Sequence, residues 1–422
     1  AWMLYPRPPF LPGNSGQPVE GARNSDTGST MWIVVPNIVQ ERRALFADHE
    51  WPLWNRASGG GIPLLGQSMT MIGDPLQWLP LAFSGAAWAW DLKFVLAKFL
   101  LALGAGLLVY AVTASVPAAV IVAASSPFIG FFEFRINHPE FFSLCYAPWL
   151  LLAWIEMLES RTWARRNGWA AVLILASLMA LNSGALKEGV TAIVCLHGVG
   201  ALAWLLTRQP ARQRLGMLAY LAGVEALFLL ISAPFWLTFL EALRQSTTLY
   251  DAGSLAGFDP ALLMGFFENA FFVQVYPETA QPSVNLLIYL GVALTVVRPR
   301  RHLRNPYFIA TGVVFLVSLA TAYDMVPASV ILAIPFVRSI SHVYTAFGDV
   351  ASVCAFLLAG MGIHMYFATC AERQWNRGLW LLLGLTAVLV AIFYHRVLQG
   401  MDYHRLRYVG IIILYLLCTA AL

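Results

Sequence analysis

The chain has 422 residues, of which 59% are hydrophobic and only 11% charged, and its mean hydropathy is +0.68. Soluble domains carry about 25% charged residues, so this composition excludes ordinary soluble domains and predicts an all-α polytopic membrane protein. The formal net charge of +4 comes from short basic clusters between apolar runs, a topology pattern that predicts no nucleic-acid partner. The five cysteines show no CxxC spacing, which predicts neither a disulfide framework nor a zinc site.

Residues 1–92 precede the first long apolar run and are predicted to form a large loop outside the membrane. The polar, Trp- and Gly-rich block at 26–80 is interpreted as the part of this loop that handles a substrate, carried on amphipathic helices. Residues 93–422 are predicted to form a transmembrane bundle with a second long outer loop at 237–283.

Apolar runs after residue 92 predict about eleven transmembrane helices. The segment 326–337 is predicted to be broken or re-entrant, because Pro327 and Pro335 bracket it. The predicted helices are 93–113, 116–132, 141–158, 169–186, 189–206, 215–236, 284–297, 307–323, 346–369, 378–394 and 408–422.

Basic residues orient these helices. Clusters at 161–166, 208–214, 298–304 and 373–377 are separated by even numbers of predicted spans, so all four can face the cytoplasm. The loops 1–92, 133–140, 187–188, 237–283 and 324–345 then share the outer side, although the cluster at 395–407 disagrees. A chain that begins outside needs a preceding span, so we expect the natural protein to extend beyond Ala1. Because Leu422 ends inside an apolar run, an extension there is a second expectation.

Asp26, in the stretch RNSDTGST, is the leading functional candidate. A carboxylate at the outer membrane surface can act as a general base toward an acceptor hydroxyl, or hold a divalent cation such as Mg²⁺ or Mn²⁺. The structural alternative is that Asp26 caps the helix that follows it.

The predicted outer loop 133–140 is short and rich in charge, with Arg135, His138 and Glu140 between two apolar spans. Such residues at a membrane interface predict ion pairing, or a site that binds phosphate and handles protons. A solvated turn, with Pro139 starting the next helix, is the alternative.

Two further groups fall on the same predicted side. Lys187 and Glu188 lie between apolar runs with hardly any loop, where charges face a cavity or each other. Arg338 and His342 lie in FVRSISHVYTAFGD, where an arginine can clamp a phosphate with two parallel hydrogen bonds. The alternatives are a Lys–Glu turn at the interface and an outer loop with a snorkelling arginine.

Other features carry weaker signals. The loop 237–283 is long and aromatic, and is interpreted as a lid lying on the membrane or as a loop packed on the bundle. The tryptophans at 51–54 and 78–90 suit an interfacial belt or sugar stacking. The triple glycine at 59–61 lacks the Gly-Lys-Ser/Thr of a phosphate loop, and no protease, hydrolase or dinucleotide motif is present.

The run WPLWN…GGGIPLLGQS…DPLQWLP resembles the first outer loop of YfhO-like bacterial membrane proteins, within the type C glycosyltransferase superfamily. The stretch 135–156 is similar to the second outer loop and following helix of that family, and 334–362 to a later segment. In that later segment His342 stands where the family has a second arginine. The first-loop residues that carry the resemblance are Asp26, Pro52 to Asn55, Gly59 to Gly61, Pro63 to Leu65, Gln67 and Ser68.

The resemblance implies a bacterial inner-membrane enzyme that transfers a sugar from a polyprenyl-phosphate donor to an acceptor at the periplasmic face. It implies that Asp26 is the base or a metal-linked carboxylate, and that His138 and Glu140 support the donor phosphate or a cation. Lys187 and Arg338 become candidate phosphate partners. Membrane lipids, and partner membrane proteins, are the other expected partners.

Two rival functions stay open. A transporter of lipid-linked substrates would show paired broken helices with charges at mid-membrane, whereas the predicted charges gather at one face. A non-catalytic subunit that keeps this fold as a scaffold is the second alternative, which the expected missing first helix and the departure at His342 keep open.

Overall fold

The computed structural model describes residues 34–57, 61–67, 70–134, 138–207, 210–245, 257–267, 283–297, 302–334, 337, 340, 343–369 and 384. This part of the chain is helical apart from one two-stranded ribbon. It divides into two compact units. Unit 1 comprises Ala1–Leu101, Phe132–His197 and Thr207–Asp251, and unit 2 comprises Ala102–Phe131, Gly198–Leu206 and Ala252–Leu422.

Within the described residues, five helices are long and apolar enough to cross a membrane by length and composition. They are α3 (Ala87–Thr113), α6 (Glu140–Glu159), α8 (Leu186–Leu206), α9 (Ala211–Gln245) and α15 (Val343–Thr369). Shorter apolar helices are α4 (Val116–Ser125), α11 (Leu286–Val297) and α13 (Pro306–Ala322). A further long helix is α7 (Trp163–Asn182). The chain is therefore an all-α polytopic membrane protein, as its composition predicted.

Every predicted span between 93 and 369 has a helical counterpart, with ends that differ by several residues. The predicted helix 116–132 is interrupted by a 3-10 turn, η5 (Ser126–Phe128), before α5 (Gly130–Phe134), because Pro127 cannot continue the α-helical hydrogen bonding. The loop predicted at 237–283 begins later, since α9 continues to Gln245; η8 (Pro260–Leu262) and α10 (Leu263–Phe267) follow. The segment 326–337 contains the short helix α14 (Ala328–Leu332), which begins after Pro327. The spans predicted at 378–394 and 408–422 lie outside the described residues, apart from residue 384.

The first loop carries α1 (Val35–Phe46), the ribbon strands β1 (Trp54–Asn55) and β2 (Ile62–Pro63), the 3-10 turns η3 (Leu65–Gln67) and η4 (Pro75–Gln77), and α2 (Trp78–Ala82). The ribbon pairs Trp54 with Pro63 and Asn55 with Ile62. The buried Asn55 amide donates to Asn37 Oδ1 at 3.3 Å, which joins the PLWN segment to α1. Gly61 has a φ of 115° and lies against the Trp54 indole, where a Cβ would come within 2.3 Å of Nε1. Asn55 and Gly61 thus have a structural role that is independent of any substrate.

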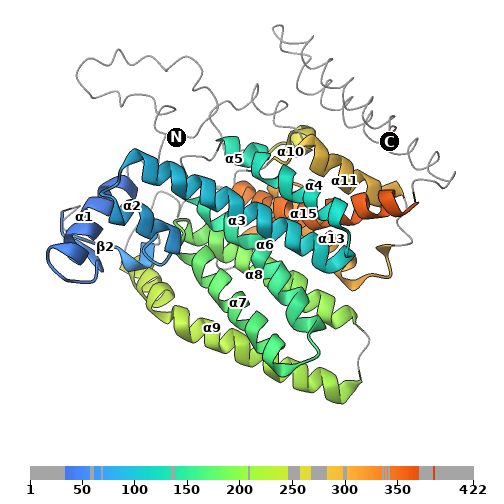
Figure 1. Cartoon of the computed structure of the whole chain (residues 1–422), viewed down its shortest axis with the longest axis horizontal. Helices are drawn as coiled ribbons and strands as arrows, with labels where there is room; N and C mark the ends of the chain where they lie inside the picture. Colours follow the sequence, from blue (N-terminus) through green and yellow to red (C-terminus); the bar gives the residue numbers. More distant parts are fainter. Residues whose placement is uncertain are drawn as a thin grey trace, which may run out of the picture. The chain divides into compact units, whose positions relative to one another are not determined.

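In unit 1, α6 packs along α7, and α7 contacts α9; the first of these pairs is visible side by side in Figure 1. The turn η3 approaches α9 closely because Gly66 has no side chain, and a Cβ there would lie 2.7 Å from the Phe239 amide nitrogen. The Trp149 indole of α6 donates to the Leu100 carbonyl of α3 at 3.0 Å. The first loop is therefore anchored on the helices of this unit.

Unit 2 is built around α15, which is buried along nearly its whole length and packs against α11, α13 and α4 (Figure 1). Small residues permit this packing. A Cβ at Gly362 would lie 2.0 Å from the Gly291 carbonyl oxygen, and one at Gly360 would lie 2.3 Å from Val109. The Asn285 amide donates to the Ser125 carbonyl at 2.9 Å, and its oxygen accepts from the Ser125 hydroxyl at 3.0 Å.

Candidate functional site

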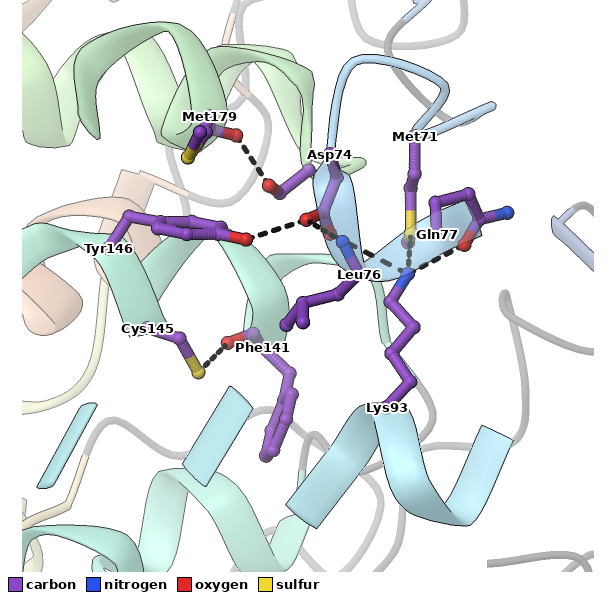
Figure 2. A network of polar contacts seen from close by, with 10 residues as sticks. Met71, Asp74, Leu76, Gln77, Lys93, Phe141, Cys145, Tyr146 and Met179 are labelled. Atoms are coloured by element: carbon purple, nitrogen blue, oxygen red, sulfur yellow. Dashed lines mark hydrogen bonds and ion pairs between the residues drawn. The ribbon is translucent and has the colours of Figure 1, made fainter. Parts of the chain in front are cut away.

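Asp74 is the centre of a buried polar cluster in unit 1, where the first loop packs against α3 and α6. It precedes Pro75 at the start of η4, where its Oδ1 accepts a hydrogen bond from the Leu76 amide at 3.0 Å. Asp before Pro is a strong local signal for such a turn, because the side chain caps an amide that the helix leaves unpaired. The same Oδ1 accepts a short hydrogen bond, 2.6 Å, from the Tyr146 hydroxyl of α6 (Figure 2).

Lys93 reaches the cluster from the first turns of α3 (Figure 2). Its Nζ donates to Gln77 Oε1 at 2.6 Å and to Met71 Sδ at 2.9 Å, and lies 3.7 Å from Asp74 Oδ2. The ammonium also lies 3.9 Å from the centre of the Phe142 ring. The side chains of Lys93 and Asp74 are fully buried, so removing either partner would leave an uncompensated charge out of water.

Glu41 of α1 is the second carboxyl group near Lys93. It is fully buried, and neither of its side-chain oxygens has a hydrogen-bond partner. Burial raises the pKa of Glu41 to about 8. The positive charge of Lys93 opposes this rise, and the nearby Gln77 amide opposes it to a smaller extent, without a well-aligned hydrogen bond to Glu41. Because Asp74 and Lys93 already balance each other, protonation of Glu41 makes the group neutral. We call Glu41, Asp74, Gln77, Lys93 and Tyr146 the Asp74 cluster.

Above the cluster, three loops of unit 1 meet at what we call the loop junction, defined by Met71, Pro139 and Gly184. Gly184, between α7 and α8, has a φ of 113°. A Cβ at this position would lie 2.3 Å from Pro139 Cβ and 2.6 Å from Met71 Cε. Nearby, a Cβ at Gly73 would lie 2.8 Å from the Asn182 side chain. Three of the segments near the loops that the basic clusters assigned to one side of the membrane, namely those at Met71, Pro139 and Gly184, therefore lie together in unit 1.

His138 and Glu140 border this junction on either side of Pro139. Glu140 is almost fully buried, while the His138 side chain is 20% exposed. His138 Nδ1 accepts a hydrogen bond from the Glu140 amide at 3.2 Å and lies 3.6 Å from Glu140 Oε2. An Nδ1 that accepts carries no proton, so this geometry corresponds to an imidazole protonated on Nε2. The two side chains lie close together, and their chemical role stays a prediction.

Lys187 lies in the first turn of α8, close in sequence to Gly184, and is half-buried. Its carbonyl accepts from the Thr191 hydroxyl at 2.9 Å. Lys187 and Glu188 thus lie in the first turn of α8, and the loop predicted at 187–188 is wrong by a few residues, because Gly184, at a positive φ, makes the turn between α7 and α8. The predicted site residues Asp26, Arg135, Arg338 and His342 lie outside the described residues.

The expected divalent cation finds no ligand set within the described residues. No three side chains among His, Cys, Asp and Glu in this part of the chain are grouped to hold a metal ion. In the Asp74 cluster, Lys93 lies between the two carboxyl groups and would repel a cation. The described residues alone therefore do not fit a cation, and no step is assigned to one.

A second polar chain links three helices of unit 1. Ser177 Oγ of α7 lies 3.1 Å from His197 Nε2 of α8, and His197 Nδ1 lies 2.7 Å from Glu225 Oε1 of α9. The order Ser–His–Glu is that of a hydrolase triad. However, Ser177 is fully buried and donates its proton to the Leu173 carbonyl at 2.8 Å, so its oxygen accepts from His197. A histidine that donates to the serine cannot activate it as a base, so this chain joins helices.

Sequence reasoning missed the Asp74 cluster as a unit. Lys93 is the signal that was available, since a lysine inside an apolar run implies a partner. The identity of that partner depended on the turn at 71–77 folding over α3, which periodicity does not report.

Fold and polar groups together define a class: a polytopic helical membrane protein with a buried ionic cluster beneath converging loops. Searches against profiles of known protein families and against curated proteins found no match. Among solved structures, the chain is similar to a crystal structure of ArnT from Cupriavidus metallidurans in the apo state. The TM-score is 0.47 and the identity 15%, over 94% of this chain and 67% of that one. Likeness at this level does not establish a shared activity.

Proposed function

We propose that this chain is a membrane glycosyltransferase that moves a sugar from a polyprenyl-phosphate donor to an acceptor hydroxyl. The observation that carries the proposal is the loop junction, where segments with His138, Glu140 and Lys187 meet the first loop. The first loop is also the part of the sequence that resembles type C glycosyltransferases. The proposal places the chain in a bacterial inner membrane, with the junction facing the periplasm.

The chemistry requires two kinds of group. The lipid phosphate leaves as an anion, so positive charge must stabilise it as the glycosidic bond breaks. Lys187 at the junction is proposed to supply this charge, and His138 to donate its Nε2 proton to a phosphate oxygen; Arg135, Arg338 and His342 stay candidate phosphate partners. The acceptor hydroxyl must lose a proton, which calls for a carboxylate within hydrogen-bond reach, and Asp26 is proposed as that base. Glu140 is proposed to orient His138.

The Asp74 cluster is proposed to position the first loop. Asp74 is closed off from solvent and held by Tyr146, Lys93 and its own turn. Because its carboxylate faces these protein partners and is closed off from solvent, Asp74 is not proposed as the base that takes the acceptor proton. The cluster is proposed to fix Met71, and with it the first loop, against the loop that contains Pro139 and against the turn between α7 and α8.

The test is sugar transfer from a labelled polyprenyl-phosphate donor pool in membranes containing the full chain. We expect Asp26→Asn to lose at least 100-fold in transfer rate, the scale of a general base. Lys187→Met should lose about as much through the leaving group. Glu50→Gln is the matched control, because Glu50 is an exposed first-loop carboxylate paired with Arg56 at 3.1 Å.

Two results would contradict the proposal, one for Asp26 and one for the enzyme as a whole. Equal transfer in Asp26→Asn and the native protein would remove Asp26 from the mechanism. No transfer by the native protein with any of several donors would reject the enzyme and favour the scaffold subunit. In that case deletion of the protein should disrupt partner complexes and leave glycans unchanged.

A further inference from the structure

A groove lies along one side of α1 in unit 1, with a volume of about 480 Å³. Its lining includes Ile38, Val39, Arg42, Arg43 and Phe46 of α1, and Ser84 from the turn before α3. Val39 and Phe46 are large apolar side chains left 63% and 51% exposed. The groove therefore combines an open apolar surface with two arginines, and none of its lining residues is acidic.

The two arginines differ in how they are held. Arg42 Nη1 donates to the Leu81 and Ala82 carbonyls at 2.7 and 3.0 Å, and its guanidinium lies over the Phe46 ring. These bonds cap the end of α2 and fix the guanidinium at the groove. Arg43 has a single ion pair, from Nε to Asp48 at 3.5 Å, and its side chain is 72% exposed. An exposed pair of this kind contributes little, so Arg43 is available to a stronger anion.

The position of the groove matches the surface of a bilayer. The membrane-crossing helix α3 begins at Ala87, just after Ser84. Exposed aromatic rings flank this point in the chain: Phe83 and Trp88 contact each other with centroids 4.5 Å apart, and Trp78 is also exposed. Exposed aromatic residues at the start of a span are typical of the level of the lipid headgroups. A groove at this level meets phosphates above and acyl chains below.

We infer that this groove binds an anionic glycerophospholipid of the surrounding bilayer, with the phosphate at Arg42 and Arg43 and an acyl chain along Val39 and Phe46. Charge complementarity selects an anionic headgroup, because a guanidinium offers paired donors to phosphate oxygens. The apolar side chains select a lipid over a free phosphate. Bound lipid would tether α1 to the membrane beside the Asp74 cluster. The inference does not rest on the proposed transfer activity.

The experiment measures lipid retained by the full chain purified in detergent with added dioleoyl phosphatidylglycerol, counted as adducts by native mass spectrometry. Dioleoyl phosphatidylcholine is the comparison lipid. Arg43→Gln is the test variant, because Arg42 also caps α2. Arg56→Gln is its control: Arg56 lies in the same loop, is similarly exposed and has a comparable ion pair with Glu50, but does not line the groove.

We expect the native protein and Arg56→Gln to retain phosphatidylglycerol over phosphatidylcholine, and Arg43→Gln to retain about fivefold less of it. Equal retention by the two variants, or equal retention of the two lipids, would overturn the inference. A third arm adds undecaprenyl phosphate. If this lipid displaces phosphatidylglycerol at equal concentration, and the displacement depends on Arg43, the groove binds a prenyl phosphate. The assignment to a bilayer phospholipid is then wrong. Thermal unfolding of each variant shows whether a loss reflects misfolding.

Discussion

Replacing Glu41 with Gln should stabilise this protein near neutral pH and remove a pH dependence. Glu41 is buried without hydrogen bonds to its oxygens, and burial raises its pKa from 4.5 to about 8. In the unfolded chain the group ionises near its ordinary pKa. The folded state therefore binds a proton that the unfolded state releases between these two values.

This difference in pKa sets the direction in which the unfolding free energy changes with pH. The stability linked to Glu41 is fully present below pH 4.5 and is lost as the pH rises toward 8. Each unit of pH within this window costs up to about 1.4 kcal/mol. Between pH 5 and pH 8 the native protein should lose roughly 3 kcal/mol of unfolding free energy through this one group. Gln keeps the size of the side chain and cannot ionise, so its variant should lose none of that energy.

The assay is thermal unfolding in detergent, followed by tryptophan fluorescence at pH 5, 6, 7 and 8. We expect the midpoint of the native protein to fall over this range by several degrees more than that of Glu41→Gln. Glu50→Gln is the control, since Glu50 is exposed and should leave the native profile unchanged. Parallel profiles for the native protein and Glu41→Gln would show that Glu41 does not titrate in the folded state as its burial requires.

Three further substitutions test the packing of unit 1 by thermal unfolding. Tyr146→Phe removes the donor to Asp74 and should cost about 1.5–3 kcal/mol, while no loss would show that this hydrogen bond does not hold the turn. Gly184→Ala places a methyl group against Pro139 at a φ of 113° and should cost more than about 1 kcal/mol. Gly168→Ala, whose methyl group meets nothing within 4 Å, should be neutral or stabilising. A larger loss of stability in Gly168→Ala than in Gly184→Ala would contradict the loop junction. Glu225→Leu leaves His197 without its acid and should cost about 1–2 kcal/mol, reduced because the carboxylate is 36% exposed, whereas an increase in the unfolding midpoint would refute a joining role.

The sequence by itself determined the class of this protein and the position of its helices. Runs of about twenty apolar residues have no stable alternative to helices in a bilayer, because every backbone polar group must be paired within the segment. This is why predicted spans such as 141–158 and 346–369 correspond closely to α6 and α15. The distribution of arginines likewise indicated that the first loop, the loop at 133–140 and the turn at 187–188 share one side, and in unit 1 the corresponding segments meet.

Only the tertiary structure decided which polar residues pair. Lys93, Asp74 and Tyr146 come from α3, a loop turn and α6, and no periodicity relates them. Nothing in the sequence singled out Glu41, yet it is fully buried and interacts electrostatically with Lys93. Pairing of this kind depends on three-dimensional closure of distant segments, in which a buried charge must find its partner because water is excluded. Sequence pattern records where such a charge lies along the chain, and the fold alone supplies the neighbour that neutralises it.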